Sequence, residues 1–203
     1  MKKLCGYLFV ALATLAATGC IDNDIPYPIV KLDILTLRAE GEKAPATINT
    51  SACTVDFELE EIIDIRKVEI KDVTFTEGAE ADVQFPGRFD MRNALYVNLT
   101  KYQTFEWTIR ATQNIERYFR VEGQIGESEI DAVSHIATAY VPMDYDMNNV
   151  RITAAKFGPK DITTYYPDPL SFTSFDGTVH HTLVSYHGDI EEMWTLKIIQ
   201  KDI

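Results

Sequence analysis

The sequence predicts an all-β protein made of two tandem antiparallel β-sandwich domains that follow a lipoprotein signal peptide. Three observations support this fold class. Apolar and polar residues alternate from about residue 29 to the end of the chain, as in strands that have one buried and one solvated face. Landmarks of the first half recur in order about 82 residues later. No long apolar stripe occurs at helical spacing.

Residues 1–19 have the features of a secretory signal peptide. The basic pair Lys2-Lys3 begins it, a short apolar run follows, and small residues precede Cys20. The apolar run is shorter than the roughly 20 residues that a membrane-spanning helix needs. The ending resembles the lipobox of bacterial lipoproteins, in which the cysteine becomes the lipid-bearing N-terminus. An ordinary signal peptide with a chance cysteine near its cleavage site is the alternative.

Residues 20–28 are expected to form a lipidated tether. Pro26 and Pro28 fix an extended backbone and remove two hydrogen-bond donors, so this segment is no strand interior. Acidic residues directly after a lipidated cysteine resemble the export signal of Bacteroidetes-type lipoproteins. We therefore expect an outer membrane lipoprotein that faces the cell exterior, held to the membrane through the Cys20 lipid; the periplasmic face is the alternative.

Residues 29–113 are expected to form the first β-sandwich domain. Its half-buried strands are predicted by alternating segments, separated by turn signals such as Glu77-Gly78 and Pro86-Gly87. The clearest of these segments are Val55–Leu59, Val68–Phe75, Leu95–Leu99 and Trp107–Ala111. One helical turn is expected near Asp64, with this residue as its cap.

Residues 114–203 are expected to form the second domain, because the landmarks of the first recur there. At an offset of 82, Glu40-Gly41 recurs as Glu122-Gly123, Asp64-Ile65 as Asp146-Met147 and Phe75 as Phe157, whereas Trp107 recurs as Trp194 at an offset of 87. The second copy therefore has about five extra residues, which we expect in or near the segment 165–169. The boundary between the copies is expected near residues 113–117.

Each copy has the size and strand density of an immunoglobulin-like sandwich: about 85–90 residues with roughly seven short strands. Trp107 and Trp194 are expected to be core anchors, with an exposed sugar-stacking role as the alternative. The Cys…Trp…Cys framework of antibody domains is absent, so the likeness is one of architecture alone. Cys53 is the only cysteine of the mature chain besides Cys20, and we expect it to be a small buried hydrophobe.

Charge and side-chain spacing exclude several functions. Without Lys2 and Lys3, 17 basic and 31 acidic residues remain, a formal charge of 17 − 31 = −14, and no basic face for nucleic acid is visible. The four histidines have no zinc-ligand spacing, and the acidic pairs Glu60-Glu61 and Glu191-Glu192 should face apart on extended backbone. We therefore expect no nucleic-acid partner, no metal, no cofactor and no catalytic residues.

Tyr165 and Tyr166 are the candidate ligand contacts. They lie next to prolines in the region where the second copy exceeds the first, and aromatic side chains on a loop can stack on sugar rings. The alternative is that one tyrosine packs beneath the loop and the other is incidental.

Several phrases of the sequence resemble the paired immunoglobulin-like N-terminal modules of Bacteroides surface lipoproteins. The segments that resemble this family are the lipobox, the tether, Ile115–Gly126, Ser185–Gly188 and Trp194–Leu196. In that family the pair often precedes a domain concerned with carbohydrate metabolism, whereas this sequence ends at Ile203, just past the last expected strand. The resemblance implies a non-enzymatic surface protein that binds or presents a glycan or another surface protein. A docking subunit of a surface or pilus-like assembly is the second hypothesis, and an enzyme with its site in the insertion is the third.

Overall fold

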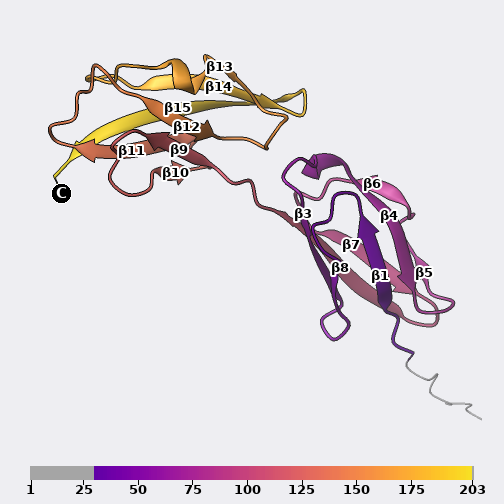
Figure 1. Cartoon of the computed structure of the whole chain (residues 1–203). Helices are drawn as coiled ribbons and strands as arrows, with labels where there is room; N and C mark the ends of the chain where they lie inside the picture. Colours follow the sequence, from indigo (N-terminus) through magenta and orange to yellow (C-terminus); the bar gives the residue numbers. More distant parts are fainter. Residues whose placement is uncertain (1–29, 203) are drawn as a thin grey trace, which may run out of the picture. The chain divides into compact units, whose positions relative to one another are not determined.

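The computed structural model describes residues 30–202, which are all-β, with 50% of residues in strands and 3% in helices. The signal peptide, Cys20 and the tether lie outside the described residues, so lipidation stays a prediction. Within the described range, no helix is both long and apolar enough to cross a membrane. The strands form several sheets, consistent with a β-sandwich architecture (Figure 1).

The N-terminal half contains a five-stranded sheet with the order β2-β3-β8-β7-β5 and a three-stranded sheet with the order β1-β4-β6. A single 3₁₀ turn, η1, precedes β4. The strands are β1 (Ile34–Ala39), β2 (Thr47–Asn49), β3 (Thr54–Leu59), β4 (Val68–Phe75), β5 (Glu80–Ala81), β6 (Gly87–Phe89), β7 (Leu95–Thr100) and β8 (Thr104–Gln113); η1 is Ile65–Lys67.

The C-terminal half contains a five-stranded sheet with the order β10-β11-β15-β14-β13 and a two-stranded sheet of β12 and β9. Figure 1 shows the long strand β15 running through this half. The strands are β9 (Tyr118–Val121), β10 (Glu129–Asp131), β11 (Ile136–Pro142), β12 (Ile152–Lys156), β13 (Thr164–Tyr166), β14 (His180–Tyr186) and β15 (Ile190–Lys201); the 3₁₀ turn η2 is Pro169–Ser171.

The two five-stranded sheets have the same strand order when β2, β3, β8, β7 and β5 are matched with β10, β11, β15, β14 and β13. The sequence led us to expect purely antiparallel sheets, and this expectation was wrong. In each half one pair is parallel, β3 with β8 and β11 with β15. A parallel pair needs a long connection between its strands, and here most of each half separates them.

Each half has its own hydrophobic core, and the two sets of buried residues do not overlap. Trp107 and Trp194 have 0% exposure, which confirms both as core residues. The Trp107 indole N–H donates to the Leu32 carbonyl at 2.9 Å, and the Trp194 ring stacks on Phe157 with 4.7 Å between centroids. Buried indoles with a satisfied N–H are large contributors to packing, so each anchors the sheets of its half.

Equivalent turns of the two halves have the same backbone geometry. Gly41 and Gly123 have φ angles of 65° and 75°, in the left-handed region that glycine adopts without strain. Cys53 and His135 have φ angles of 53° and 54°. Cys53 therefore lies in a turn before β3, half-buried against the core, rather than fully buried on the strand as its spacing suggested.

The extra residues of the second half lie in more than one place. Val97 lies opposite Trp107 across the β7–β8 hairpin, and Thr182 lies opposite Trp194 across the β14–β15 hairpin. The offset is 182 − 97 = 85 on the first strand and 194 − 107 = 87 on the second, so two extra residues lie within the hairpin itself. The expectation that all five lie near residues 165–169 was wrong, because a hairpin can lengthen without a change of strand order.

The helical turn expected near Asp64 is η1, and Asp64 is its cap. Its carboxylate accepts a hydrogen bond from the Arg66 backbone N–H at 3.0 Å. The same carboxylate forms an ion pair with the Arg66 guanidinium at 2.8 Å. In the second half, Asp146 accepts from the Asn148 N–H at 3.0 Å in the same way. Short Asp side chains cap the N-terminal end of a turn by this contact, so the same contact recurs in both halves.

Candidate binding face

The tyrosine pair predicted as a ligand contact lies on a strand, not on a loop. Tyr165 and Tyr166 belong to β13, the strand at one edge of the C-terminal five-stranded sheet. Successive side chains of a strand point to opposite faces, so one tyrosine points toward the core and the other away from it. The structure therefore separates the two candidates.

Tyr165 is half-buried and packs against the core of the C-terminal half. Its ring packs edge-on against Phe157 with 6.2 Å between centroids, and its hydroxyl oxygen accepts a hydrogen bond from the Phe157 backbone N–H at 3.1 Å. Burial raises the pKa of the Tyr165 hydroxyl above its usual range. The Tyr165 ring and hydroxyl are thus engaged with Phe157, and the structure does not favour Tyr165 as a ligand contact.

Tyr166 is 80% exposed and has apolar neighbours. It lies opposite Leu183 of β14, and Leu183 in turn lies opposite Met193 of β15, which is 55% exposed. Residues opposite each other share one face of a sheet, so these three side chains form a continuous row across three strands. We call Tyr166, Leu183 and Met193 the apolar row.

Polar side chains lie on both sides of the apolar row. Thr164, Ser185 and Glu191 are mutually opposite on the side toward the β14–β15 turn. On the other side His181 lies opposite Thr195, with its Nδ1 atom 3.1 Å from the threonine Oγ1. The outer face of this sheet thus has an apolar strip with hydroxyl, carboxylate and imidazole groups along its margins.

Sequence reasoning missed Leu183 and Met193, although it identified the strands that contain them. The alternation around Trp194 already places Met193 on the outer face, but register decides which residues lie side by side. The register here depends on the turn between Tyr186 and Ile190. A comparison of the two halves could have found the row only with the offsets of 85 and 87 residues that the two hairpin strands have in the structure.

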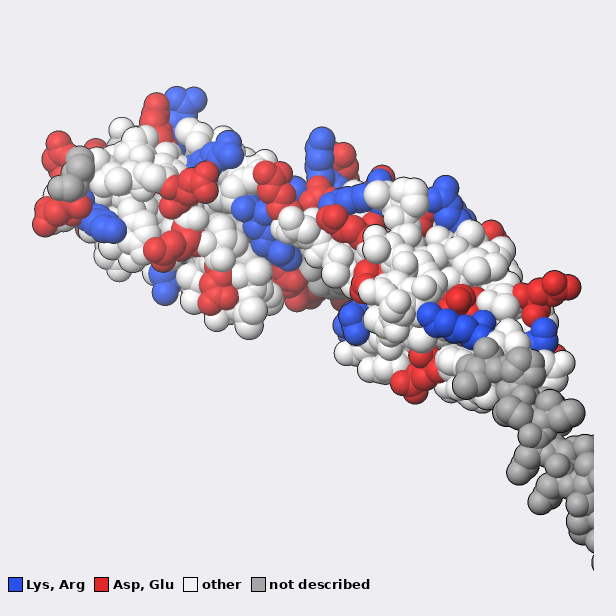
Figure 2. Space-filling model, turned by 90° about the horizontal axis from the view of Figure 1, so that it is seen from below, with Lys and Arg blue, Asp and Glu red and all other residues white. Residues whose placement is uncertain are grey.

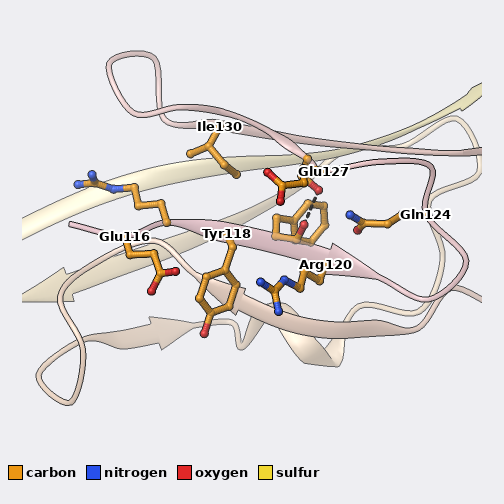
Figure 3. A pocket seen from close by; sticks show the side chains of 9 residues that line it. Glu116, Tyr118, Arg120, Gln124, Glu127 and Ile130 are labelled. Carbon is orange, nitrogen blue, oxygen red and sulfur yellow. Dashed lines mark hydrogen bonds between the residues drawn. The ribbon is translucent and has the colours of Figure 1, made fainter. Parts of the chain in front are cut away.

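A small cavity lies elsewhere in the C-terminal half, between β9 and the segment that leads to β10 (Figure 3). Its volume is about 160 Å³, below the roughly 300–1,000 Å³ of common small-molecule sites. The lining is mostly polar and contains Glu116, Arg117, Tyr118, Arg120 and Glu127, with Phe119, Gln124, Ser128 and Ile130.

The polar groups of this cavity are largely engaged with one another or with the backbone. The Ser128 hydroxyl donates to the Phe119 carbonyl, the dashed line of Figure 3. Gln124 accepts from the Val121 N–H at 2.7 Å, and the Arg120 guanidinium lies 4.9 Å from the Tyr118 ring centroid. A nucleophilic serine needs a neighbouring base such as histidine. Ser128 donates to a carbonyl instead, and the cavity lining contains no histidine.

A polar cluster around Glu192 supports the core of the same half. Its carboxylate accepts from the Tyr186 hydroxyl at 2.5 Å and from the Trp194 indole N–H at 2.9 Å. Burial, and then the bond to this carboxylate, raises the pKa of the Tyr186 hydroxyl. The His135 ring lies against Trp194 with 5.4 Å between centroids. Both carboxylate oxygens have donors, so the cluster positions the indole.

The histidines do not converge on a common point. His180 stacks on Phe172 with 4.2 Å between centroids, and His187 lies against Tyr186. Across residues 30–202, no group of three or more His, Cys, Asp or Glu side chains is placed to hold a metal ion. On the face drawn in Figure 2, acidic and basic side chains are interspersed, so no charged patch there marks a binding site.

The class that the described residues define is an all-β protein with several sheets and sandwich-like layering. No protein-family model and no curated protein matches the sequence. Among solved structures, the chain is similar to a protein from Bacteroides thetaiotaomicron described as a "putative glycoside hydrolase", with 16% identity and a TM-score of 0.39. The match covers 52% of this chain and 33% of that one. Similarity at this level says nothing about activity.

Proposed function

We propose that this chain is a lipid-anchored cell-surface protein whose two immunoglobulin-like domains bind or present a glycan and carry out no catalysis. The common strand order of the two five-stranded sheets and the equivalent positions of Trp107 and Trp194 support the tandem domains. The lipobox-like ending at Cys20 and the acidic residues after it support the anchor and the outer face of the outer membrane.

The observation that carries the binding function is the exposure of Tyr166 within the apolar row. An aromatic face beside aliphatic side chains can contact the C–H face of a sugar ring, and nearby hydroxyl groups can bond its rim. The contact would be shallow, so we expect affinity on the order of tens of micromolar to millimolar.

A docking subunit of a surface assembly is the second candidate. The six-residue edge strand β1 of the three-stranded sheet leaves room for it, whereas the edges of the five-stranded sheets do not favour it. Docking by strand addition needs a long exposed edge strand. In the described part of the chain, the edge strands of the five-stranded sheets, β2, β5, β10 and β13, are two or three residues long. Short edges of this kind disfavour pairing with another chain.

The proposal is tested in cells of a Bacteroidetes-type host. The wild-type protein is expected to enter the detergent phase, and intact cells that express it should retain a labelled neutral polysaccharide above the level of cells without it. Cys20→Ser is expected to abolish both properties, because the lipid is attached at this sulfur. Unchanged detergent partition in the variant would overturn the anchor. Equal retention by wild-type and non-expressing cells would overturn glycan binding at the surface.

A further inference from the structure

The outer face of the C-terminal five-stranded sheet differs from that of its N-terminal counterpart at three equivalent positions. In the N-terminal sheet these positions are Asp82, Asn98 and Glu106. Asn98 lies opposite Glu106, directly beside the pair formed by Val97 and Trp107, and the Asp82 backbone N–H donates to the Asn98 carbonyl. All three are polar, and the Asp82 carboxylate accepts from the backbone and side-chain nitrogens of Asn98, each at 2.8 Å. The same fold therefore does not require apolar residues there.

In the C-terminal sheet the equivalent positions are the apolar row. Exposed apolar side chains contribute little to folding, and the N-terminal sheet has polar residues at all three of these positions. We propose, on the basis of the function proposed above, that the apolar row is a subsite for one or two neutral pyranose rings of a glycan, stacked on Tyr166 and extending over Leu183 toward Met193.

The dimensions of the row favour a small flat ligand over a protein. Neighbouring strands lie about 4.8 Å apart, so the row is about 10 Å long from β13 to β15. Three side chains offer a few hundred square ångström at most, whereas a stable protein interface takes about 800 Å² and 20–30 residues from each partner. The row is too small to hold a second protein.

The margins of the row favour a neutral sugar. The polar rows lie about 7 Å to either side, two residues along each strand, within reach of hydroxyl groups on a ring that lies over the row. Thr164, Ser185 and Thr195 supply hydroxyls and His181 an imidazole. The nearest formal charge in these flanking rows is the Glu191 carboxylate, which repels the carboxylates and sulfates of anionic glycans.

An exposed tyrosine alone does not make this arrangement. Tyr96 on the outer face of the N-terminal sheet is 60% exposed, but it lies opposite Thr108 and has no apolar partner across the β7–β8 pair. Tyr96 thus serves as a matched control for Tyr166: the same side chain on an equivalent sheet without the row.

The experiment is calorimetric titration of the chain from residue 21 onward with cello-, manno-, xylo- and maltohexaose and with an oligogalacturonate. The test variants are Tyr166→Ala and the triple substitution Tyr166→Asp, Leu183→Asn and Met193→Glu, which copies residues that the N-terminal sheet already accommodates. We expect at least one neutral hexasaccharide to bind, Tyr166→Ala to weaken it at least tenfold, the triple variant to abolish it, and Tyr96→Ala to leave it within twofold.

The outcomes separate this inference from the proposed function. Neutral-sugar binding that survives the triple substitution would overturn the subsite and leave glycan binding standing. Absence of binding to every oligosaccharide would overturn both. Preference for the oligogalacturonate, or wild-type self-association that the triple variant abolishes, would overturn the neutral pyranose as the occupant. Circular dichroism of each variant establishes that a loss of binding is not a loss of fold.

Discussion

At the scale of single residues, short polar side chains hold the turns of both halves. Asp64 and Asp146 were predicted as a repeated pair, and both accept a hydrogen bond from the backbone N–H two residues on. This contact is local, so sequence reasoning could find it. The tyrosine pair is different: Tyr165 turns inward and Tyr166 outward because both lie on β13, and nothing local in this proline-rich segment showed that it pairs with β14.

The Asp64 ion pair makes a pH-dependent contribution to stability. The Arg66 side chain lowers the Asp64 pKa from 3.8 to about 2. A carboxyl group with a depressed folded-state pKa stabilises the fold above its unfolded pKa, and this contribution is lost as the pH falls from about 4 to about 2. Asp64→Asn keeps an acceptor for the Arg66 N–H and removes the charge.

We therefore expect Asp64→Asn to lower the free energy of unfolding by roughly 1–2 kcal/mol at pH 7, with the difference shrinking as the pH falls below about 4 and vanishing below about 2. Urea unfolding across this pH range measures it. The exposed pair Asp90 and Arg92 is the comparison, and Asp90→Asn should have a smaller effect because solvent screens it. A difference between wild type and Asp64→Asn that is constant with pH would show that the charge does not contribute.

At the scale of elements, period-two alternation predicted most strands, and the repeat predicted that they recur in order. Alternation also identified the buried face of β8 and β15 through Trp107 and Trp194. The pairing partners were harder to predict, because the paired residues of β3–β8 and β11–β15 are 54 and 59 positions apart in the sequence (108 − 54 and 195 − 136). Their register arises from tertiary packing, which no local pattern encodes.

The separate cores predict that damage to one half stays local. Trp107→Ala should destabilise the N-terminal half by about 3–5 kcal/mol, the usual cost of a large aromatic cavity, and should also leave the Leu32 carbonyl without its indole donor. Hydrogen exchange should accelerate in strands β1 to β8 and remain near wild-type rates in β9 to β15. Trp194→Ala should show the reverse pattern.

Tyr102→Ala is the control for these substitutions, since Tyr102 is 66% exposed and its truncation opens no cavity. Equal loss of protection in both halves of either Trp variant would contradict independent cores.

At the scale of the whole molecule, the sequence was informative about fold class and repeat and much less so about the binding face. The all-β class follows from alternation that extends over nearly the whole described chain. The apolar row could not be predicted, because it depends on the register of three strands and on a difference between two sheets that are otherwise alike. Export and lipidation were inferred from residues 1–28 alone, and they remain predictions.

The central claim is that the apolar row receives a neutral sugar, and methyl-group NMR tests it most directly. With ¹³C-labelled methionine and leucine methyls, titration with a neutral hexasaccharide should shift the Met193 and Leu183 resonances saturably. Met143, which is 58% exposed outside the row, and the buried Leu59 should not move. Shifts at Met143 or Leu59 with none at Met193 and Leu183, or no shift at any methyl, would contradict the account.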